Sequence, residues 1–238
     1  MRVLLVRGLI AGLVAGLLAL VFARIFGEPS IGSAIAFESA QGEAAQGEIT
    51  EPELVSRAVQ SSVGLATAVL VYAVAFGGLF SLAFATAYGR VGQLSARATA
   101  AVLALVGYLV VYVVPFLKYP ANPPAVGNED TIGQRTGWYL AMVVISVLLA
   151  VTAVYLGRRL TSRLGTWNAA LAAGVGYVVA VAAAQALLPS INEAPEAFPA
   201  TVLWDFRVSS LGTQLVLWAT LGLLFGVLIT PRQLIFRG

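Results

Sequence analysis

The chain has no cysteine and no histidine among its 238 residues. Without cysteine it has no disulfides, no thiolate metal sites and no haem-attachment motif. Without histidine it lacks the commonest transition-metal ligand and the side chain best suited to proton transfer near neutral pH. Phosphate-binding loops, HExxH and serine nucleophile elbows are missing too. We therefore expect neither an enzyme nor a covalently bound cofactor.

Charge is also scarce, since 11% of residues are charged whereas 59% are hydrophobic. Apolar stretches of roughly 20 residues recur, and each is long enough to cross ~30 Å of hydrocarbon as a helix. Strand-period alternation is absent, which favours helices, because helices satisfy their own backbone groups in lipid. We predict an all-α integral membrane protein in which residues 1–238 form one polytopic domain. The six predicted spans are residues 3–26, 63–88, 98–117, 136–156, 167–188 and 211–230.

The distribution of charge predicts the orientation of these spans. Two tails and two connections contain basic residues and no acid: Arg2, Arg7, Arg90, Arg97, Arg158, Arg159, Arg163, Arg232 and Arg237. By the positive-inside bias both termini are cytoplasmic. All eleven carboxylates then fall in three extracytoplasmic loops. The net charge of +3 reflects this cytoplasmic rim, so we do not expect nucleic-acid binding. The predicted location is the cytoplasmic (inner) membrane.

The first span has two interpretations. Basic residues precede its apolar core and a small-x-small pattern follows at residues 34–36, as in a cleavable signal peptide. Alternatively, it is a permanent member of the bundle. Gly8, Gly12 and Gly16 share one helical face at four-residue spacing, which suits close packing against another helix.

The predicted outer loop of residues 27–57 is the one long soluble segment, and it is rich in Glu, Ala, Gly and Gln. We expect it to be partly flexible, with a solvated stretch at residues 41–47. Thr50 and Glu53 fit a capping box with Pro52 between them, which predicts a short helix near residues 50–57.

Each predicted outer loop returns to the membrane with an arginine near the start of the next helix. These are Arg57, Arg135 and Arg207. A cation at a helix N-terminus opposes the helix dipole, so each needs a compensating partner. The nearest acids along the chain are Glu53 for Arg57, Glu129 or Asp130 for Arg135, and Asp205 for Arg207. Such clusters are either interfacial ion pairs that hold the loops or functional polar sites.

The second and third outer loops are rich in proline. Proline lacks an N–H and resists helix, so carbonyls in these loops are available to water or to an ion. A hard cation bound by carbonyl, amide and carboxylate oxygens is chemically reasonable there. Our candidate residues for an entrance site are Glu129, Asp130 and Asp205.

One loop motif is distinctive. It reads Lys118-Tyr-Pro-Ala-Asn-Pro-Pro-Ala-Val-Gly127 and is followed by Thr131-Ile-Gly-Gln-Arg135 and Tyr139. Together with the Arg-rich start, the Glu38-bearing segment and the late run from Phe206 to Gln214, it resembles the CbtA family of probable cobalt transporter subunits, in its actinobacterial form. The resemblance covers essentially the whole chain.

This resemblance implies a membrane subunit linked to cobalt uptake for cobalamin synthesis. It also implies a small single-span partner subunit, CbtB, bearing histidines. Co²⁺ favours nitrogen ligands, so we do not expect a high-affinity cobalt site made from this chain alone. In this interpretation the outer acids attract a divalent cation such as Co²⁺. The residues expected to organise the entrance loops or gate are Lys118, Tyr119, Asn122, Arg135, Arg207 and Gln214.

A non-transporting scaffold within a larger membrane complex is the alternative. It is supported by the lack of any Asp, Glu, Lys or Arg near the centre of a predicted span. In either case membrane lipids surround the chain, and other membrane subunits are candidate partners.

Overall fold

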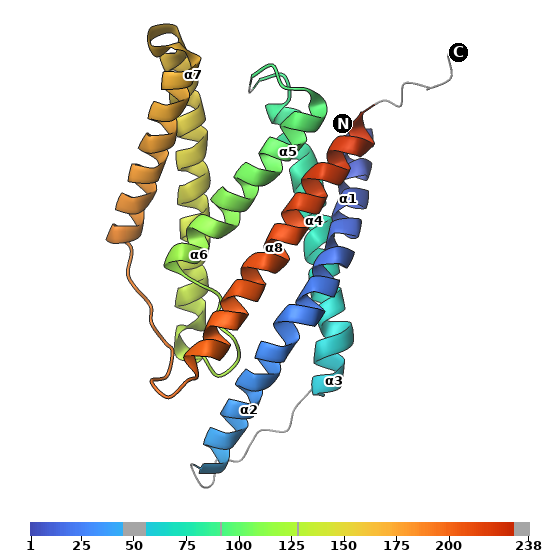
Figure 1. Ribbon diagram of the computed structural model, residues 1–238, viewed down its shortest axis with the longest axis vertical. Helices are drawn as coiled ribbons and strands as arrows, with labels where there is room; N and C mark the ends of the chain where they lie inside the picture. Colours follow the sequence, from blue (N-terminus) through green and yellow to red (C-terminus); the bar gives the residue numbers. More distant parts are fainter. Residues whose placement is uncertain (45–55, 91, 128, 231–238) are drawn as a thin grey trace, which may run out of the picture. The chain divides into compact units, whose positions relative to one another are not determined.

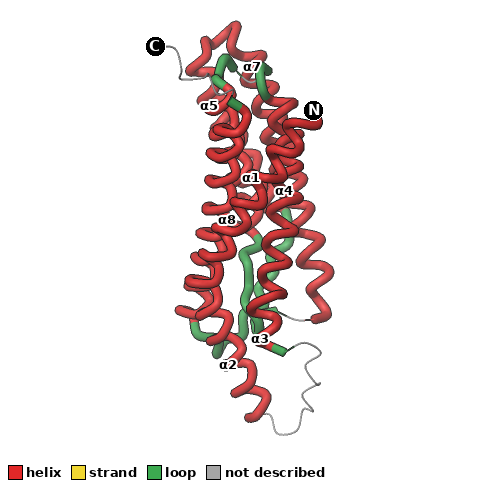
Figure 2. Tube along the Cα trace, turned by 90° about the vertical axis from the view of Figure 1, so that its right-hand side faces the viewer, coloured by secondary structure: helices red, strands yellow, loops and turns green. Residues whose placement is uncertain are grey.

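The computed structural model describes residues 1–44, 56–90, 92–127 and 129–230. Within these ranges all regular secondary structure is helical, as the colours of Figure 2 show. The predicted all-α class is thus confirmed for the described residues. Helices long and apolar enough to cross a membrane number five there: Arg2–Gln41, Arg57–Ala87, Ala96–Lys118, Thr131–Leu187 and Ala200–Ile229.

Figure 1 labels the α-helices and colours them along the sequence, from blue at the N-terminus to red at the C-terminus. In the part of the chain that the structure describes, three short π-helical segments, η1 to η3, interrupt or extend the α-helices. The elements are α1 (Arg2–Phe22), η1 (Ala23–Gly27), α2 (Glu28–Ala44), α3 (Arg57–Val59), η2 (Gln60–Gly64), α4 (Leu65–Ala87), α5 (Ala96–Gly107), η3 (Tyr108–Val113), α6 (Val114–Lys118), α7 (Glu129–Leu187) and α8 (Ala200–Ile229).

The chain divides into two compact units, which we describe separately. Unit 1 comprises Met1–Tyr108, Pro123–Ala125 and Pro199–Gly238, and unit 2 comprises Leu109–Asn122 and Val126–Phe198. No shift in composition along the sequence marks this division.

In unit 1, α1 packs against α4 through its glycine face. Gly8, Gly12 and Gly16 are all buried. A Cβ added at Gly8 or Gly12 would overlap the carbonyl oxygen of Gly77 or Ala73, and one added at Gly16 would lie 2.7 Å from the Cβ of Ala73. The two backbones therefore approach as closely as only small residues allow.

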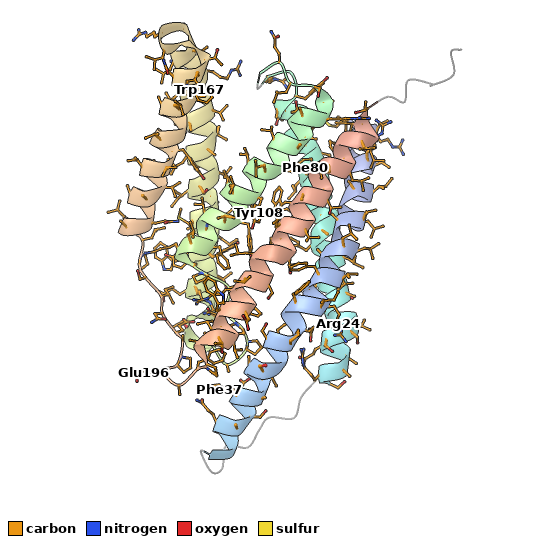
Figure 3. The ribbon with its side chains drawn as sticks, in the orientation of Figure 1. Arg24, Phe37, Phe80, Tyr108, Trp167 and Glu196 are labelled. Atoms are coloured by element: carbon orange, nitrogen blue, oxygen red, sulfur yellow. The ribbon has the colours of Figure 1, made fainter. Side chains whose placement is uncertain are left out.

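The remaining helices of unit 1 pack around α8, which contacts both α1 and α5. Phe225 of α8 is completely buried and meets the edges of Phe80 and Phe84 from α4, with ring centroids 5.3 and 5.2 Å apart. Phe80 is labelled in Figure 3. This aromatic cluster and the glycine contact hold unit 1 together by close packing, which is the main source of helix association in lipid.

In unit 2, α7 folds back on itself (Figure 1). Gly165 breaks the helix with φ 74° and ψ 164°, a conformation that favours glycine. The two halves lie side by side, because a Cβ added at Gly157 would be 3.0 Å from the Cβ of Ala173. Trp167 is 74% exposed and lies beside the turn (Figure 3).

The helices extend beyond the apolar stretches that predicted them. α2 is helical from Glu28 through Ala44, whereas we expected residues 27–57 to form a loop with a solvated stretch at residues 41–47. α8 begins at Ala200, so Asp205 and Arg207 lie in a helix and not in a loop. Apolar composition marks the hydrocarbon crossing, but Glu, Ala and Gln also favour helix in water. The helix predicted near residues 50–57 falls mostly outside the described residues, and α3 begins at Arg57.

Candidate functional site

A cluster of polar contacts in unit 2 holds the loop before α7 against the loop after it. Arg135 Nη1 donates to Glu193 Oε2 at 2.8 Å, and the hydroxyl of Thr131 donates to the other carboxylate oxygen. The side chain of Glu193 is only 9% exposed. We had expected Glu129 or Asp130 beside Arg135, but the described partner is Glu193. We call Lys118, Tyr119, Thr131, Arg135, Ser190 and Glu193 the loop clasp.

The second half of the loop clasp starts where α6 ends. Lys118 Nζ donates to Ser190 Oγ at 3.0 Å, and the Tyr119 hydroxyl donates to the Pro189 carbonyl at 2.8 Å. Burial raises the pKa of the Tyr119 phenol, so it remains a donor at neutral pH. Lys118, Tyr119 and Arg135 therefore all contact the loop that follows α7, and these contacts lie within unit 2.

Gly127 is required by this geometry. Its φ is 145°, and an added Cβ would be 3.0 Å from Arg135 Nη1 and 3.4 Å from Glu193 Oε2. The backbone thus passes directly beside the ion pair. Asn122 is partly buried in the same loop.

Side chains of α7 also donate hydrogen bonds to backbone carbonyls of η3 and of the first residue of α6. Pro115 has no N–H to offer the carbonyl one turn earlier, and the preceding segment η3 takes π geometry. The buried Ser146 hydroxyl contacts the Val110 carbonyl at 2.7 Å and the Tyr177 hydroxyl at 2.8 Å. Gln185 Nε2 donates to the Val114 carbonyl at 2.9 Å.

A second ionic cluster ties α2 to the start of α3 and η2 in unit 1. Arg57 Nη2 lies 2.6 Å from Glu28 Oε2, and Arg24 Nη1 lies 3.9 Å from the same oxygen. Arg24 also donates to the Ser61 carbonyl at 2.5 Å. Arg57 is therefore compensated by Glu28, while the partner we predicted, Glu53, lies outside the described residues.

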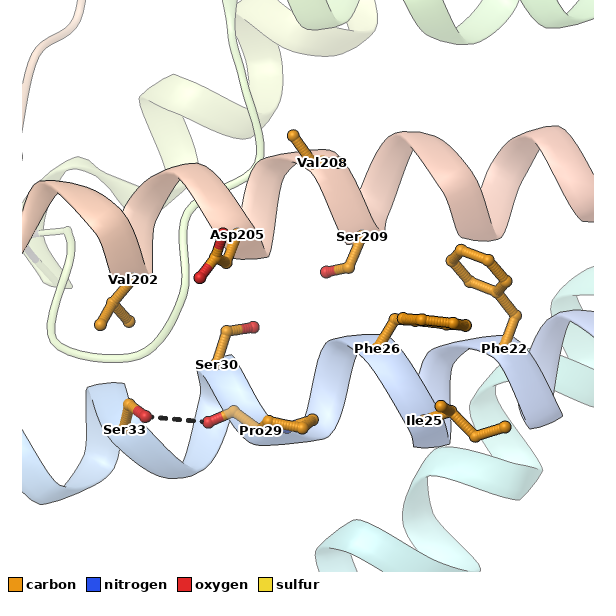
Figure 4. Close-up of a pocket in the computed structure, with 10 residues that line it drawn as sticks. All are labelled: Phe22, Ile25, Phe26, Pro29, Ser30, Ser33, Val202, Asp205, Val208 and Ser209. Carbon is orange, nitrogen blue, oxygen red and sulfur yellow. Dashed lines mark hydrogen bonds between the residues drawn. The ribbon is translucent and has the colours of Figure 1, made fainter.

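Asp205 lies at a pocket of about 420 Å³ between the helical run η1–α2 and α8, all within unit 1 (Figure 4). The other polar side chains that line it are Ser30, Ser33 and Ser209, and the remaining walls are apolar. Ser30 and Ser209 are each 6% exposed. Arg207 is two residues beyond Asp205, about 200° around the helix, and does not line the pocket.

Further along α8, two buried polar atoms have no hydrogen-bond partner among the described residues. These are Gln214 Oε1 and Trp218 Nε1, an acceptor and a donor one helical turn apart. Trp218 meets the ring of Phe76 edge-on, with centroids 5.7 Å apart. Buried polar atoms usually have a hydrogen-bond partner, so these two atoms are exceptions within the described core.

The acids proposed for the entrance site are divided between the units. Glu129 and Asp130 are the first residues of α7 in unit 2, and Asp205 belongs to unit 1. The side chains of Glu129 and Asp130 lie outside the described residues. Among the described residues, no three His, Cys, Asp or Glu side chains gather closely enough to hold a metal ion.

Comparison with known proteins identifies the family. The model of the family described as "Probable cobalt transporter subunit (CbtA)" matches residues 1–230. The chain belongs to the CbtA family. It is thus a membrane-embedded transporter subunit, consistent with its apolar helices, and a subunit implies that further subunits exist. Searches among curated proteins and among solved structures returned no match.

In this CbtA chain, sequence reasoning missed Glu193, Glu28 and the serines that line the pocket. Glu193 and Glu28 were placed among the outer acids, but nothing local indicates which arginine each would meet. Ser30 and Ser209 sit one turn from Phe26 and Asp205, so a helical projection of the longer helices would have placed them on the pocket face.

Proposed function

We propose that the chain is a subunit of a cobalt uptake transporter in the cytoplasmic membrane. The family match over residues 1–230 carries this proposal. Because histidine and cysteine are lacking, the side chains that this chain offers Co²⁺ are mainly oxygen ligands. A single-span partner bearing histidines would supply the nitrogen ligands that hold cobalt more tightly.

Six membrane crossings are the arrangement we favour. The 57-residue helix Thr131–Leu187 is interrupted at Gly165, and each part is long enough to cross the hydrocarbon once. With six crossings both termini are on one side, and the arginines of the tails assign that side to the cytoplasm.

The outer acids act as an electrostatic entrance in this proposal. Glu129, Asp130 and Asp205 raise the local concentration of a divalent cation, and the loop clasp keeps the surrounding loops in place. Arg207 and Gln214 line α8 further along as candidate gate residues. The absence of a strong metal site in this proposal suits transport, because a conducting site must release its ion as well as bind it.

A scaffold that does not transport is the second candidate. It is favoured by the charged residues of the described ranges, none of which is among the fully buried residues. These helices therefore offer no buried charge to carry an ion by themselves, and a neighbouring subunit would have to form the pathway.

Uptake of radioactive cobalt by cells separates the two candidates. We would compare cells with the chain alone, with its genetic neighbours, and with Asp205→Asn in the complete set. The transporter proposal predicts that removing the chain abolishes uptake and that Asp205→Asn reduces it. The scaffold role would be established by two results together: cobalt uptake persists when the chain is removed, and the chain co-purifies with other membrane subunits in a fixed ratio.

A further inference from the structure

The pocket beside Asp205 has an unusual polar lining. Each of its three serine hydroxyls donates its hydrogen to a carbonyl of its own helix: Ser30 to Gly27 at 2.8 Å, Ser33 to Pro29 at 3.0 Å and Ser209 to Phe206 at 2.9 Å. A hydroxyl has one hydrogen and two lone pairs, so each serine oxygen retains only acceptor capacity. The hydroxyls therefore have lone pairs, and no hydrogens, left for a ligand.

Asp205 adds a fourth acceptor. An ionised carboxylate accepts hydrogen bonds and donates none. Figure 4 shows the Ser30 and Ser209 side chains directed into the space between the helices, with Asp205 beside them. Since every polar side chain that lines the pocket is an acceptor, the pocket repels anions and matches a ligand that carries positive charge or many donors.

The volume of the pocket favours a hydrated cation over a dehydrated one. Its volume of about 420 Å³ exceeds the roughly 180 Å³ that six water molecules occupy in the liquid at about 30 Å³ each. One carboxylate and three hydroxyls are too few to replace a complete hydration shell. The water molecules of a hydrated divalent cation, in contrast, are all donors and find acceptors on both walls.

We propose that the pocket formed by Ser30, Ser33, Asp205 and Ser209 is a binding station for a hydrated divalent cation. The inference rests on the proposed transport function and adds to it a location and a form of the ion. The cation enters with its water shell, Asp205 provides the charge, and the serine oxygens accept hydrogen bonds from bound water. A single carboxylate makes the station weak, which allows the ion to leave again.

Binding can be measured directly on the complete chain in nanodiscs of phosphatidylcholine. Mn²⁺ serves as the probe because the paramagnetic resonance signal of the free ion disappears on binding, and Co²⁺ is added as competitor. We expect Asp205→Asn to weaken Mn²⁺ binding about tenfold, since a charged acceptor is lost. Glu196→Gln is the matched control, because Glu196 is exposed and lies in unit 2 (Figure 3), and its binding should stay within about twofold of the parent.

The serines provide a second, neutral test. Ser30→Ala with Ser209→Ala should weaken binding about threefold, because two water-accepting oxygens are removed. Ser39→Ala is the control, since Ser39 makes the same kind of bond, to the Ile35 carbonyl at 3.0 Å, on an exposed part of α2. The proposal would be overturned if the double serine variant bound Mn²⁺ as tightly as Ser39→Ala does. It would also be overturned if Asp205→Asn bound Mn²⁺ as tightly as Glu196→Gln does. Displacement of Mn²⁺ by choline more readily than by Co²⁺ would overturn it as well.

These outcomes are separable from those of the uptake assay. Loss of cobalt uptake on removal of the chain, with unchanged Mn²⁺ binding by Asp205→Asn, would refute the pocket and leave the transport function standing. Weakened binding by Asp205→Asn, with cobalt uptake independent of the chain, would support the pocket and refute the transport function.

Discussion

Arg135 and Glu193 are 58 residues apart in the sequence and form an ion pair of 2.8 Å that joins the beginning of α7 to the loop after it. Thr131 donates to the second oxygen of the same carboxylate. Both oxygens of a nearly buried carboxylate are thus satisfied by residues of one helix. Because α7 turns back at Gly165, the ion pair closes the open end of its hairpin.

Glu193→Gln should destabilise unit 2. The substitution leaves Arg135 partly buried without its counter-ion, which costs about 1–3 kcal/mol of unfolding free energy. Thermal unfolding in detergent, followed by tryptophan fluorescence, measures the change. Glu196→Gln removes an exposed carboxylate from the same loop and should leave the midpoint where it is. Equal midpoints for the two variants would show that the ion pair contributes nothing.

Gly12→Ala should separate α1 from α4. The new methyl group would overlap the Ala73 carbonyl, and overpacking of this kind costs about 1–3 kcal/mol. Gly32→Ala introduces the same methyl group in α2, where nothing lies within 4 Å, and should be neutral or stabilising because alanine favours helix. The yield of folded protein after detergent extraction distinguishes the two. Similar yields would mean that the helices adjust without loss.

Ser146→Ala should destabilise the contact between η3 and α7. It removes a hydroxyl that contacts the Val110 carbonyl and the Tyr177 hydroxyl, and leaving such buried groups unpaired costs about 1–3 kcal/mol. Ser162→Ala deletes an exposed hydroxyl that bonds only within its own turn, and serves as the control. Amide hydrogen exchange in residues 108–113 should accelerate in the first variant alone. Unchanged exchange in residues 108–113 would show that the Ser146 hydroxyl does not stabilise the contact between η3 and α7.

Gln214→Leu and Gln185→Leu should change the unfolding temperature in opposite directions. Gln214 Oε1 is buried without a partner, so its replacement should maintain or raise the unfolding temperature, whereas Gln185 donates to the Val114 carbonyl and its loss should lower it. A gate role for Gln214 additionally requires that cobalt uptake falls in this stable variant. Retained uptake would assign the residue to packing.

The absence of cysteine allows the topology to be tested without a modified background. Ser39→Cys and Glu196→Cys should react with a membrane-impermeant maleimide in intact cells, because both positions are exposed and belong to predicted outer segments. Ser162→Cys, near the turn of α7, should react only after the cells are opened. Labelling of Ser162→Cys from outside would reverse the proposed orientation.

The sequence predicted the all-helical class, because continuous apolar stretches of this length favour helices. It did not predict where the helices end. Asp205 was expected in a loop, but α8 extends beyond the apolar stretch because polar residues favour helix equally well in water. A single sequence likewise does not determine which arginine pairs with which acid. The predicted connection between residues 156 and 167 places Arg135 and Glu193 on the same side, but it does not distinguish Glu193 from the other acids there.

The contact between Gly12 and Ala73 also determines the order of assembly. These residues are about 60 positions apart, so α1 enters the membrane before its partner α4 has been synthesised, and its glycine face first meets lipid. Lipid accepts that face because the backbone of a helix is already hydrogen-bonded. A substitution at Gly12 would therefore permit insertion and prevent assembly. Its effect in cells would be degradation of an inserted chain, which an uptake assay without a measurement of protein amount would mistake for a defect in ion handling.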